Sequence, residues 1–517
     1  MKRTILILVI VTCLPVYLFA QTERTVLFQD DFENGSAAQW EYEDGWQIVQ
    51  DNGNYVFEGQ GHHWAKPLKR DYYSDATFQA RFKLIEGGFH FNILFRSGRY
   101  FFPIRSESIE FIADTTNVIR LDYPVSKAAW HTVKVSLEAN RMEFSLDDSL
   151  LVEYEDPKRY KLFGKLAFEG IDHIYVDDIL ISGDEAFYKA QEVRWVRTGG
   201  PLGGIGYDVR IDPGDPNIIY VTDNWAGCHK SYDGGKTWHP QNEDISSRFG
   251  PTGDSIPIFC LTVDPNDANT VWCGTFGMRG AYRSTDKGAH WELRANGIPN
   301  TTRLTFRSFA VEPGNSNVVY CGAEWGLSED EIPAGQRSAS KGKIYKTIDG
   351  GENWLEVLDS NALVRTIIID PTDPKIVYAA TGIFDRDDVQ EEGIWKSTDA
   401  GATWVHINNG ITNLTIGDIE MHPNNSSILL AAAGRLNGFG GGADAERGEI
   451  LRSVDGGQTW SRSYGGYMGK PFTYVEFDES NPDIVYAAAS DRGFYKSVDG
   501  GISWFETTYN PPYVNPG

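Results

Sequence analysis

The sequence has few cysteines, a deficit of positive charge and almost no long apolar run. Only five of its 517 residues are cysteine, and 72 acidic residues outnumber 47 basic ones, for a formal net charge of −25. This charge argues against nucleic acid and acidic membrane surfaces as partners, because both need clustered Lys and Arg. Beyond the first twenty residues no stretch is apolar enough to cross a bilayer, so no membrane insertion is expected.

Four cysteines follow the first twenty residues: Cys228, Cys260, Cys273 and Cys321. Cys260 and Cys273 fall on segments expected to form neighbouring antiparallel strands, and they could pair in an oxidising compartment. The alternative is that all four are small, buried apolar residues. The sequence leaves both alternatives open.

The one long apolar run opens the chain. "MKRTILILVIVTCLPVYLFA", residues 1–20, begins with Lys2 and Arg3 and ends with Ala20 at a plausible cleavage point. This is the pattern of a signal peptide, and the run is short for a bilayer span of ~20 residues. We therefore expect an exported protein, located in the periplasm, at the cell surface or outside the cell.

Residues 26–183 alternate apolar and polar side chains in short runs without a helical period. In "ATFQARFKL", Phe78, Ala80, Phe82 and Leu84 share one face of a strand. Strands of this kind predict a two-sheet sandwich. The order of "DDFENGSAAQW", "FHFNILFR" and "VDDILIS" resembles a concanavalin-A-like jelly roll, a resemblance that implies glycan binding on a concave sheet.

The strand "GFHFNILFR" carries the candidate ligand-binding residues of this domain. Its apolar residues take one face and leave His90, Asn92 and Arg96 on the other. That polar face could hold sugar hydroxyls, or it is an ordinary solvated face. Asp31 and Asp178 could ligate a structural calcium ion. No other metal and no required cofactor is expected.

A short polar linker, residues 184–192, precedes a repeat that occupies residues 193–510. One octet occurs six times: "SYDGGKTW" from Ser231, "STDKGAHW" from Ser284, "TIDGGENW" from Thr347, "STDAGATW" from Ser397, "SVDGGQTW" from Ser453 and "SVDGGISW" from Ser497. Each copy follows two apolar strands joined by a short turn. Six four-stranded units predict a six-bladed β-propeller, and "VRWVRTGG" before the first unit leaves a seventh blade open. The predicted fold class is all-β, a jelly-roll sandwich followed by this propeller.

The octet has the composition of a turn. An aspartate such as Asp233 can accept hydrogen bonds from N–H groups of its own turn, and Gly235 can supply a left-handed conformation. Six equivalent aspartates cannot all act at one site, so we expect them to be structural. The octet matches the Asp box of sialidases, sortilin-type receptors and xyloglucanase-type glycoside hydrolases. This resemblance implies the propeller fold and leaves the function open.

One face of the predicted ring carries the short turns and the octets, and the opposite face carries loops of very different length. Binding and catalysis usually lie on such irregular loops. The first unit, "GGPLGGIGYDVRIDPGDPNIIYVTDNWAGCHKSYDGGKTW", resembles the first blade of xyloglucanase-type hydrolases. The resemblance implies a catalytic carboxylate at Asp223. Near Asp223, Trp225 could stack on a sugar ring of the ligand, and His229 is a possible hydrogen-bond partner.

Glycoside hydrolysis needs a second carboxylate near the same bond. Glu324, Asp385 and Asp491 lie on the variable loops and are the candidates. Arg307 and Arg365 head the innermost strands of neighbouring blades. They could clamp a carboxylate or sulfate group, or they could pair with acidic loop residues.

Three functions stay open. The first is a secreted carbohydrate-active protein that binds a polysaccharide or glycoconjugate and, if it is an enzyme, hydrolyses glycosidic bonds. Trp325 is a further candidate contact for that ligand. The second is a non-catalytic propeller that binds a protein or peptide, as sortilin-type receptors do. The third is a sialidase-like exo-glycosidase that uses Arg307 and Arg365 on an acidic sugar.

Overall fold

The computed structural model describes residues 24–68, 73–95, 98–113, 117–155, 163–184, 206–223, 225–249, 255–277, 280–332, 334, 339–382, 390–434, 448–463, 471–489 and 493–507. The predicted signal peptide and most of the predicted linker lie outside these ranges. Every regular element within them is a β-strand. Among these residues, no helix has the length and apolar character needed to span a bilayer. The chain divides into two compact units with a boundary between Lys189 and Ala190.

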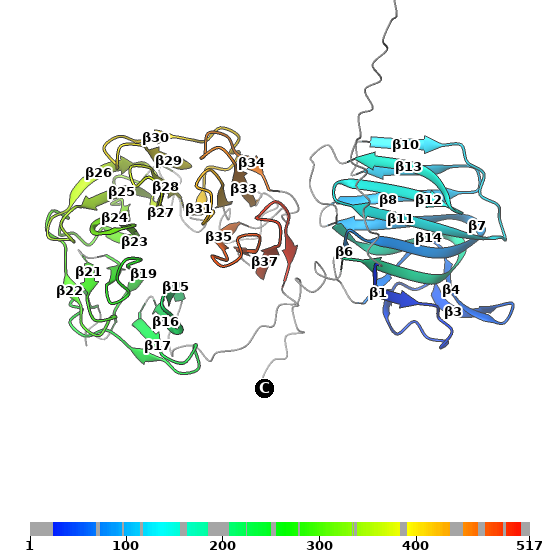
Figure 1. Ribbon diagram of the computed structural model, residues 1–517, viewed down its shortest axis with the longest axis horizontal. Helices are drawn as coiled ribbons and strands as arrows, with labels where there is room; N and C mark the ends of the chain where they lie inside the picture. The colour runs from blue at the N-terminus through cyan, green and yellow to red at the C-terminus, as the bar shows by residue number, and fades with distance from the viewer. Residues whose placement is uncertain are drawn as a thin grey trace, which may run out of the picture. The chain divides into compact units, whose positions relative to one another are not determined.

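The first unit, blue to cyan in Figure 1, contains fourteen described strands that pair antiparallel. Their bounds are β1 Thr25–Asp30, β2 Trp40–Tyr42, β3 Trp46–Asp51, β4 Asn54–Gln60, β5 His63–Pro67, β6 Tyr73–Ser74, β7 Thr77–Phe95, β8 Gly98–Arg105, β9 Ile109–Ala113, β10 Asn117–Leu121, β11 Trp130–Glu138, β12 Arg141–Leu146, β13 Ser149–Glu155 and β14 Phe163–Gly183. Seven strands follow the order β10-β9-β8-β7-β11-β12-β13. The long strand β14 pairs with β1, β4, β5, β6 and β7.

An aromatic core explains why these strands alternate apolar and polar residues. The shared face predicted for residues 78–84 is confirmed, since its four apolar side chains are fully buried. Phe168 of β14 is at the centre of the core, with ring centroids 5.5 Å from Phe89, 5.7 Å from Phe91 and 5.4 Å from Trp40. Because side chains alternate along a strand, the residues of β7 and β14 that lie between these core residues point to the opposite face of the sheet.

The second unit consists of six four-stranded antiparallel sheets arranged in a ring, a six-bladed β-propeller (Figure 1). The sheets are β15 Gly206–Asp212, β16 Asp215–Asp223, β17 Gly227–Ser231 and β18 His239–Pro240; β19 Ile258–Val263, β20 Val271–Thr275, β21 Ala281–Ser284 and β22 Glu292–Leu293; β23 Leu304–Glu312, β24 Asn315–Gly326, β25 Ser340–Thr347 and β26 Leu355–Ser360; β27 Val364–Ile369, β28 Val377–Thr381, β29 Ile394–Ser397 and β30 Val405–His406; β31 Ile416–Met421, β32 Leu429–Ala433, β33 Glu449–Ser453 and β34 Ser461–Arg462; β35 Phe472–Phe477, β36 Val485–Ala489, β37 Gly493–Ser497 and β38 Phe505–Glu506. Figure 1 shows first strands such as β23 and β27 toward the centre of the ring and fourth strands such as β26 and β30 at its rim.

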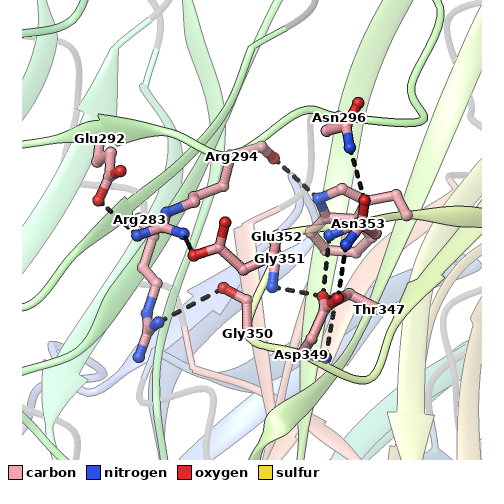
Figure 2. Close-up of polar contacts among 11 residues, drawn as sticks. Arg283, Glu292, Arg294, Asn296, Thr347, Asp349, Gly350, Gly351, Glu352 and Asn353 are labelled. Carbon is pink, nitrogen blue, oxygen red and sulfur yellow. Dashed lines mark hydrogen bonds and ion pairs between the residues drawn. The ribbon is translucent and has the colours of Figure 1, made fainter.

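Each octet forms the turn between the third and fourth strands of its sheet. In the third sheet, Asp349 Oδ1 accepts hydrogen bonds from Thr347 Oγ1 at 2.7 Å and from Asn353 N at 2.9 Å, and Asp349 Oδ2 accepts one from Asn353 Nδ2 at 2.9 Å (Figure 2). Gly351 has a φ of +90°, which a glycine adopts without strain. The prediction that an octet aspartate holds its own turn is confirmed here.

The octets also join each sheet to the one before it. Lys346 Nζ and Tyr320 Oη of the third sheet both donate to the carbonyl oxygen of Ala400, in the octet of the fourth sheet, at 2.8 Å. Figure 2 shows the same kind of contact between Arg283 of the second sheet and the Gly350 carbonyl, at 3.4 Å. We call this contact of a basic side chain with the next octet the octet interlock. A Lys or Arg stands directly before all six octets, which is the sequence signal for it.

The outer faces of the first and sixth sheets differ from the faces inside the ring. Tyr486 of the sixth sheet is 36% exposed, and Val209 and Ile211 of the first sheet are more than half exposed. The residues equivalent to Tyr486 in the other sheets are at most 1% exposed: Tyr220, Trp272, Tyr320, Tyr378 and Leu430. Near the axis the two sheets are linked by Arg210, which donates to Tyr474 Oη at 3.1 Å. Neighbouring sheets elsewhere in the ring thus bury their facing apolar side chains against each other, whereas the facing side chains of the sixth and first sheets stay partly exposed.

The four cysteines of the described chain are free and buried, so the Cys260–Cys273 disulfide that the sequence left open is not formed. In the β19–β20 register, Cys260 lies opposite Gly274 and Cys273 lies opposite Leu261. The two cysteines therefore point to opposite faces of their sheet, into different cores. They are small buried apolar residues, which was the alternative reading.

Candidate functional site

The first strand of each propeller sheet contains a β-bulge near its N-terminal end, on the loop face. In the second to sixth sheets the extra residue is Phe259, Arg307, Arg365, Gly417 or Thr473. The extra residue of a bulge breaks the regular alternation of side chains between the two faces of the sheet, so its side chain points in a new direction. The two arginines singled out in the sequence thus stand at equivalent, re-aimed positions of neighbouring blades, near the axis of the ring.

Arg307 and Glu324 form a buried ion pair. The Arg307 guanidinium donates to Glu324 Oε2 through Nε at 3.0 Å and through a second, shorter contact from its Nη2 atom. Both side chains are at most 3% exposed, and the guanidinium carbon lies 4.8 Å from the ring centroid of Phe259. Glu324 therefore holds Arg307 and is not placed as a solvent-facing catalytic carboxylate. The pairing with an acidic residue is the alternative that the sequence left open for Arg307.

Arg365 lies close to this ion pair and is only partly buried. Burial and the like charge of Arg307 lower the pKa of its guanidinium, against the opposite effect of the Asp208 and Asp418 carboxylates. The cluster at the axis thus carries both signs of charge. Three other predicted site residues, Asp385, Asp491 and Arg96, lie outside the described residues.

Asp223 ends β16 and is buried. Its Oδ1 atom accepts hydrogen bonds from the backbone N–H groups of Trp225 and Ala226, both at 2.9 Å, and so holds the turn into β17. The Trp225 carbonyl accepts a hydrogen bond from Ile256 N at 3.0 Å. The backbone of Trp225 is therefore fixed on both sides, while the residue is 49% exposed.

His229 lies on β17, opposite Val221 of β16. Burial lowers its pKa, and the negative charge of Asp223 acts in the opposite direction. Its Nδ1 atom is buried and has no hydrogen-bond partner among the described residues. Asp223, Trp225 and His229 thus belong to one hairpin, with Asp223 and His229 on the same face of it, and the lowered pKa of His229 favours its neutral form near neutral pH.

Trp325 lines a separate groove in the third sheet. The prediction that Glu324 lies on a variable loop is wrong: β24 continues to Gly326 and β25 begins at Ser340, because Trp325 pairs with Lys341 in an extended hairpin. The open groove beside it has a volume of about 660 Å³ and is lined by Pro299, Trp325, Leu327, Glu331, Lys341, Lys343, Glu356 and Asp359.

None of the charged residues that line this groove was identified from the sequence. Lys343 Nζ lies 2.9 Å from Glu356 Oε1 and 5.5 Å from the Trp325 ring centroid. Arg303 lies 5.3 Å from the same ring and pairs with Glu331. The local sequence indicates this groove only through Lys341 and Lys343, which are two residues apart and so share one face of a strand. That spacing becomes informative only once the register of the hairpin is known.

The candidate residues of the first unit already have protein partners. Asn92 is fully buried and donates to the His90 carbonyl at 3.2 Å, so their side of β7 is not an open, solvated face. Asp31 Oδ1 accepts a hydrogen bond from the backbone N–H two residues on, at 3.2 Å. Asp178 Oδ2 accepts one from Arg81 at 2.6 Å. The calcium site on Asp31 and Asp178 stays a prediction.

Comparisons with known proteins extend over part of the chain. No family model matches it. A stretch of 336 residues, 59% of this chain and 29% of the relative, is 24% identical to a xyloglucanase of Paenibacillus sp.. A stretch of 234 residues, 44% of this chain and 24% of the relative, is 25% identical to sortilin of Danio rerio. The chain thus spans about a quarter of the length of these curated relatives.

Solved structures are similar to part of the chain, among them that of a glycoside hydrolase. The crystal structure of an ancestral GH74 enzyme is 22% identical over 59% of this chain and 38% of that one, with a TM-score of 0.44. A similarity at this level carries no argument about the site. The all-β class and the six-bladed propeller rest on the sheets described above.

Proposed function

We propose that the protein is carbohydrate-active and binds a polysaccharide or glycoconjugate on the loop face of its propeller. The observation that carries this proposal is Trp225, whose side chain is exposed while its backbone is fixed by Asp223 and Ile256. An exposed indole on a fixed backbone offers a large flat apolar surface at a low entropic cost for the main chain. The similarity of part of the chain to a xyloglucanase supports a polysaccharide as the ligand.

The groove beside Trp325 supports the same function. It combines the apolar surface of Pro299, Trp325 and Leu327 with carboxylate and ammonium groups. Carboxylates accept hydrogen bonds and ammonium groups donate them, so both kinds can bind sugar hydroxyls. Concave sites with an apolar floor and a few polar groups are where small ligands usually bind.

The test is retention in native gels that contain one polysaccharide each, with xyloglucan included in a panel of plant, algal and host polysaccharides. Trp225→Ala is expected to lose retention, and Trp325→Ala to weaken it. Tyr232→Ala is the matched control, because Tyr232 is similarly exposed, at 53%, on the octet of the same sheet. Full retention by both tryptophan variants, on every polysaccharide that retains the wild type, would contradict the proposal.

Hydrolysis is the second candidate function, with Asp223 as one carboxylate. It is favoured by the xyloglucanase similarity and by the position of Asp223 beside an exposed indole. A two-carboxylate mechanism requires a partner about 5–9.5 Å away. Glu324 is committed to Arg307, so Asp385 and Asp491 remain the candidates for that partner. Released reducing sugars from a retained polysaccharide would establish hydrolysis.

Three further parts of the proposal rest on the sequence. Export rests on the signal-peptide pattern of residues 1–20. The assignment of the octets as Asp boxes and of residues 26–183 as a concanavalin-A-like domain rests on their motifs. A protein or peptide ligand is the alternative that the sortilin similarity favours. The sialidase-like reading loses support, because Arg307 is already paired with Glu324.

A further inference from the structure

Three side chains from separate parts of the first unit converge on one point. His62 Nε2 lies 2.6 Å from Glu169 Oε1, and His90 Nδ1 lies 2.9 Å from Glu169 Oε2. One donor atom from each of the three residues lies within 4.8 Å of the others. No local motif marks them in the sequence, because the fold alone brings them together.

The strands explain this convergence. His90 and Glu169 alternate with Phe89, Phe91 and Phe168, whose rings form the aromatic core, so both polar side chains point away from that core. His62 lies in the turn between β4 and β5. The preceding residue of that turn is anchored by a hydrogen bond from its N–H to the Asp172 carbonyl at 2.6 Å.

The donor set is that of an open zinc site. Two imidazole nitrogens and one carboxylate are common zinc ligands, and three protein ligands leave a fourth position for water. His90 and Glu169 are buried, whereas the His62 side chain is 65% exposed and leaves a route from solvent. Within the part of the first unit that the structure describes, His90 Nε2 and Asn92 Oδ1 beside the cluster are buried without a hydrogen-bond partner.

We propose that His62, His90 and Glu169 bind one divalent metal ion of the zinc class. The competing explanation is a hydrogen-bonded cluster that binds no ion. A simple pair of that kind exists in the same unit, with His173 Nε2 2.8 Å from Glu58 Oε1.

The test is titration of the untagged, chelator-treated full chain with Zn²⁺ alone by isothermal calorimetry, with bound metal counted by elemental analysis. The wild type is expected to bind one Zn²⁺ per chain at this site. His62→Ala and Glu169→Gln should each weaken binding about tenfold or more, whereas His173→Ala should leave it unchanged. His62 is exposed, so His62→Ala tests binding even if Glu169→Gln does not fold.

Binding of Co²⁺ gives a second readout, because d–d absorption bands report the ligand set directly. Tetrahedral bands that disappear in His62→Ala and persist in His173→Ala would support the site. Absence of stoichiometric Zn²⁺ binding would overturn it. Binding that His62→Ala leaves unchanged would overturn it equally, since the ion would then lie elsewhere.

Discussion

At the scale of single residues, Asp223 combines a structural bond with a candidate chemical role. Its Oδ1 atom accepts two backbone hydrogen bonds, and an asparagine keeps an oxygen at that position. We expect Asp223→Asn to fold and to retain polysaccharide like the wild type. Asp223→Ala should lower the free energy of unfolding by about 1 kcal/mol, because two partly buried N–H groups lose their acceptor. Thermal unfolding and native-gel retention measure both effects.

The same pair of variants separates binding from hydrolysis. If the wild type releases sugars, Asp223→Asn should abolish that release without loss of retention, because an amide neither transfers a proton nor stabilises positive charge. Sugar release at the wild-type rate by Asp223→Asn would remove Asp223 from the mechanism. Equal destabilisation by Asn and Ala would show that the charge of Asp223, and not its acceptor atom, holds the turn.

Some of these residues could be predicted from the sequence and others could not, for a physical reason. Asp223, Trp225 and His229 are close along the chain, so a single hairpin brings them together. The pairing of Arg307 with Glu324 depends on a bulge in β23 and on an extended hairpin, which are properties of strand register. Register is set by contacts between distant residues, and local composition does not reveal it.

At the scale of elements, the octet turns and their interlocks hold the sheets in order. Asp349→Ala removes the acceptor for Thr347 Oγ1, Asn353 N and Asn353 Nδ2, while Gly350 still faces Arg283 (Figure 2). We expect a lower melting temperature for the propeller and unchanged retention of polysaccharide. Scanning calorimetry and native gels measure the two properties. Loss of retention at an unchanged melting temperature would instead place the octet in the binding site.

The outer face of the sixth sheet gives a second test at this scale. Tyr378 is 1% exposed and its hydroxyl donates to the Gly456 carbonyl of the next octet at 3.1 Å, whereas the equivalent Tyr486 is 36% exposed. Truncating a fully buried aromatic residue costs roughly 3–5 kcal/mol. Tyr378→Ala should reach that range, and Tyr486→Ala should cost less than half as much by denaturant unfolding. An equal cost would show that the face around Tyr486 is covered in solution.

Prediction of elements from sequence was best where the repeat and the alternation were strict. The six octets predicted six sheets, and the alternation in residues 78–84 predicted a buried face. The segment around Glu324 was wrongly predicted as a loop, because β24 and β25 form an extended hairpin there. These strands contain Gly322, Glu324 and Gly342, which are poor strand formers, and cross-strand pairing overrides that local preference.

At the scale of the whole molecule, buried acids at the axis and the acids of the octets give stability opposite pH dependences. Burial raises the pKa of Asp418 to about 7, and burial together with neighbouring carboxylates raises the pKa of the partly buried Glu420. These groups hold protons in the folded state that the unfolded chain has released above about pH 4. The folded state therefore binds more protons, and stability falls as the pH rises from about 4 to about 7.

The aspartates of the octets make stability depend on pH in the opposite direction. Hydrogen bonds from the residue four positions on lower the pKa to about 2 for Asp233, Asp349, Asp399 and Asp455. Their contribution is complete above about pH 4, where the unfolded chain is ionised, and is lost as the pH falls toward 2. The melting temperature of the propeller should therefore be highest near pH 4–5 and fall on both sides.

Asp418→Asn tests the predicted fall of the melting temperature between pH 4 and pH 7. The variant keeps an acceptor near Val475 N, which donates to Asp418 Oδ2 at 3.2 Å, and it removes the ionisable group. We expect a flatter dependence of the melting temperature between pH 4 and pH 7. Asp483→Asn is the control, because Asp483 is exposed and should leave the profile unchanged. If the wild type instead becomes steadily more stable from pH 4 to pH 8, the axial acids are ionised in the folded ring, and their negative charge is compensated by Arg210 and Arg365.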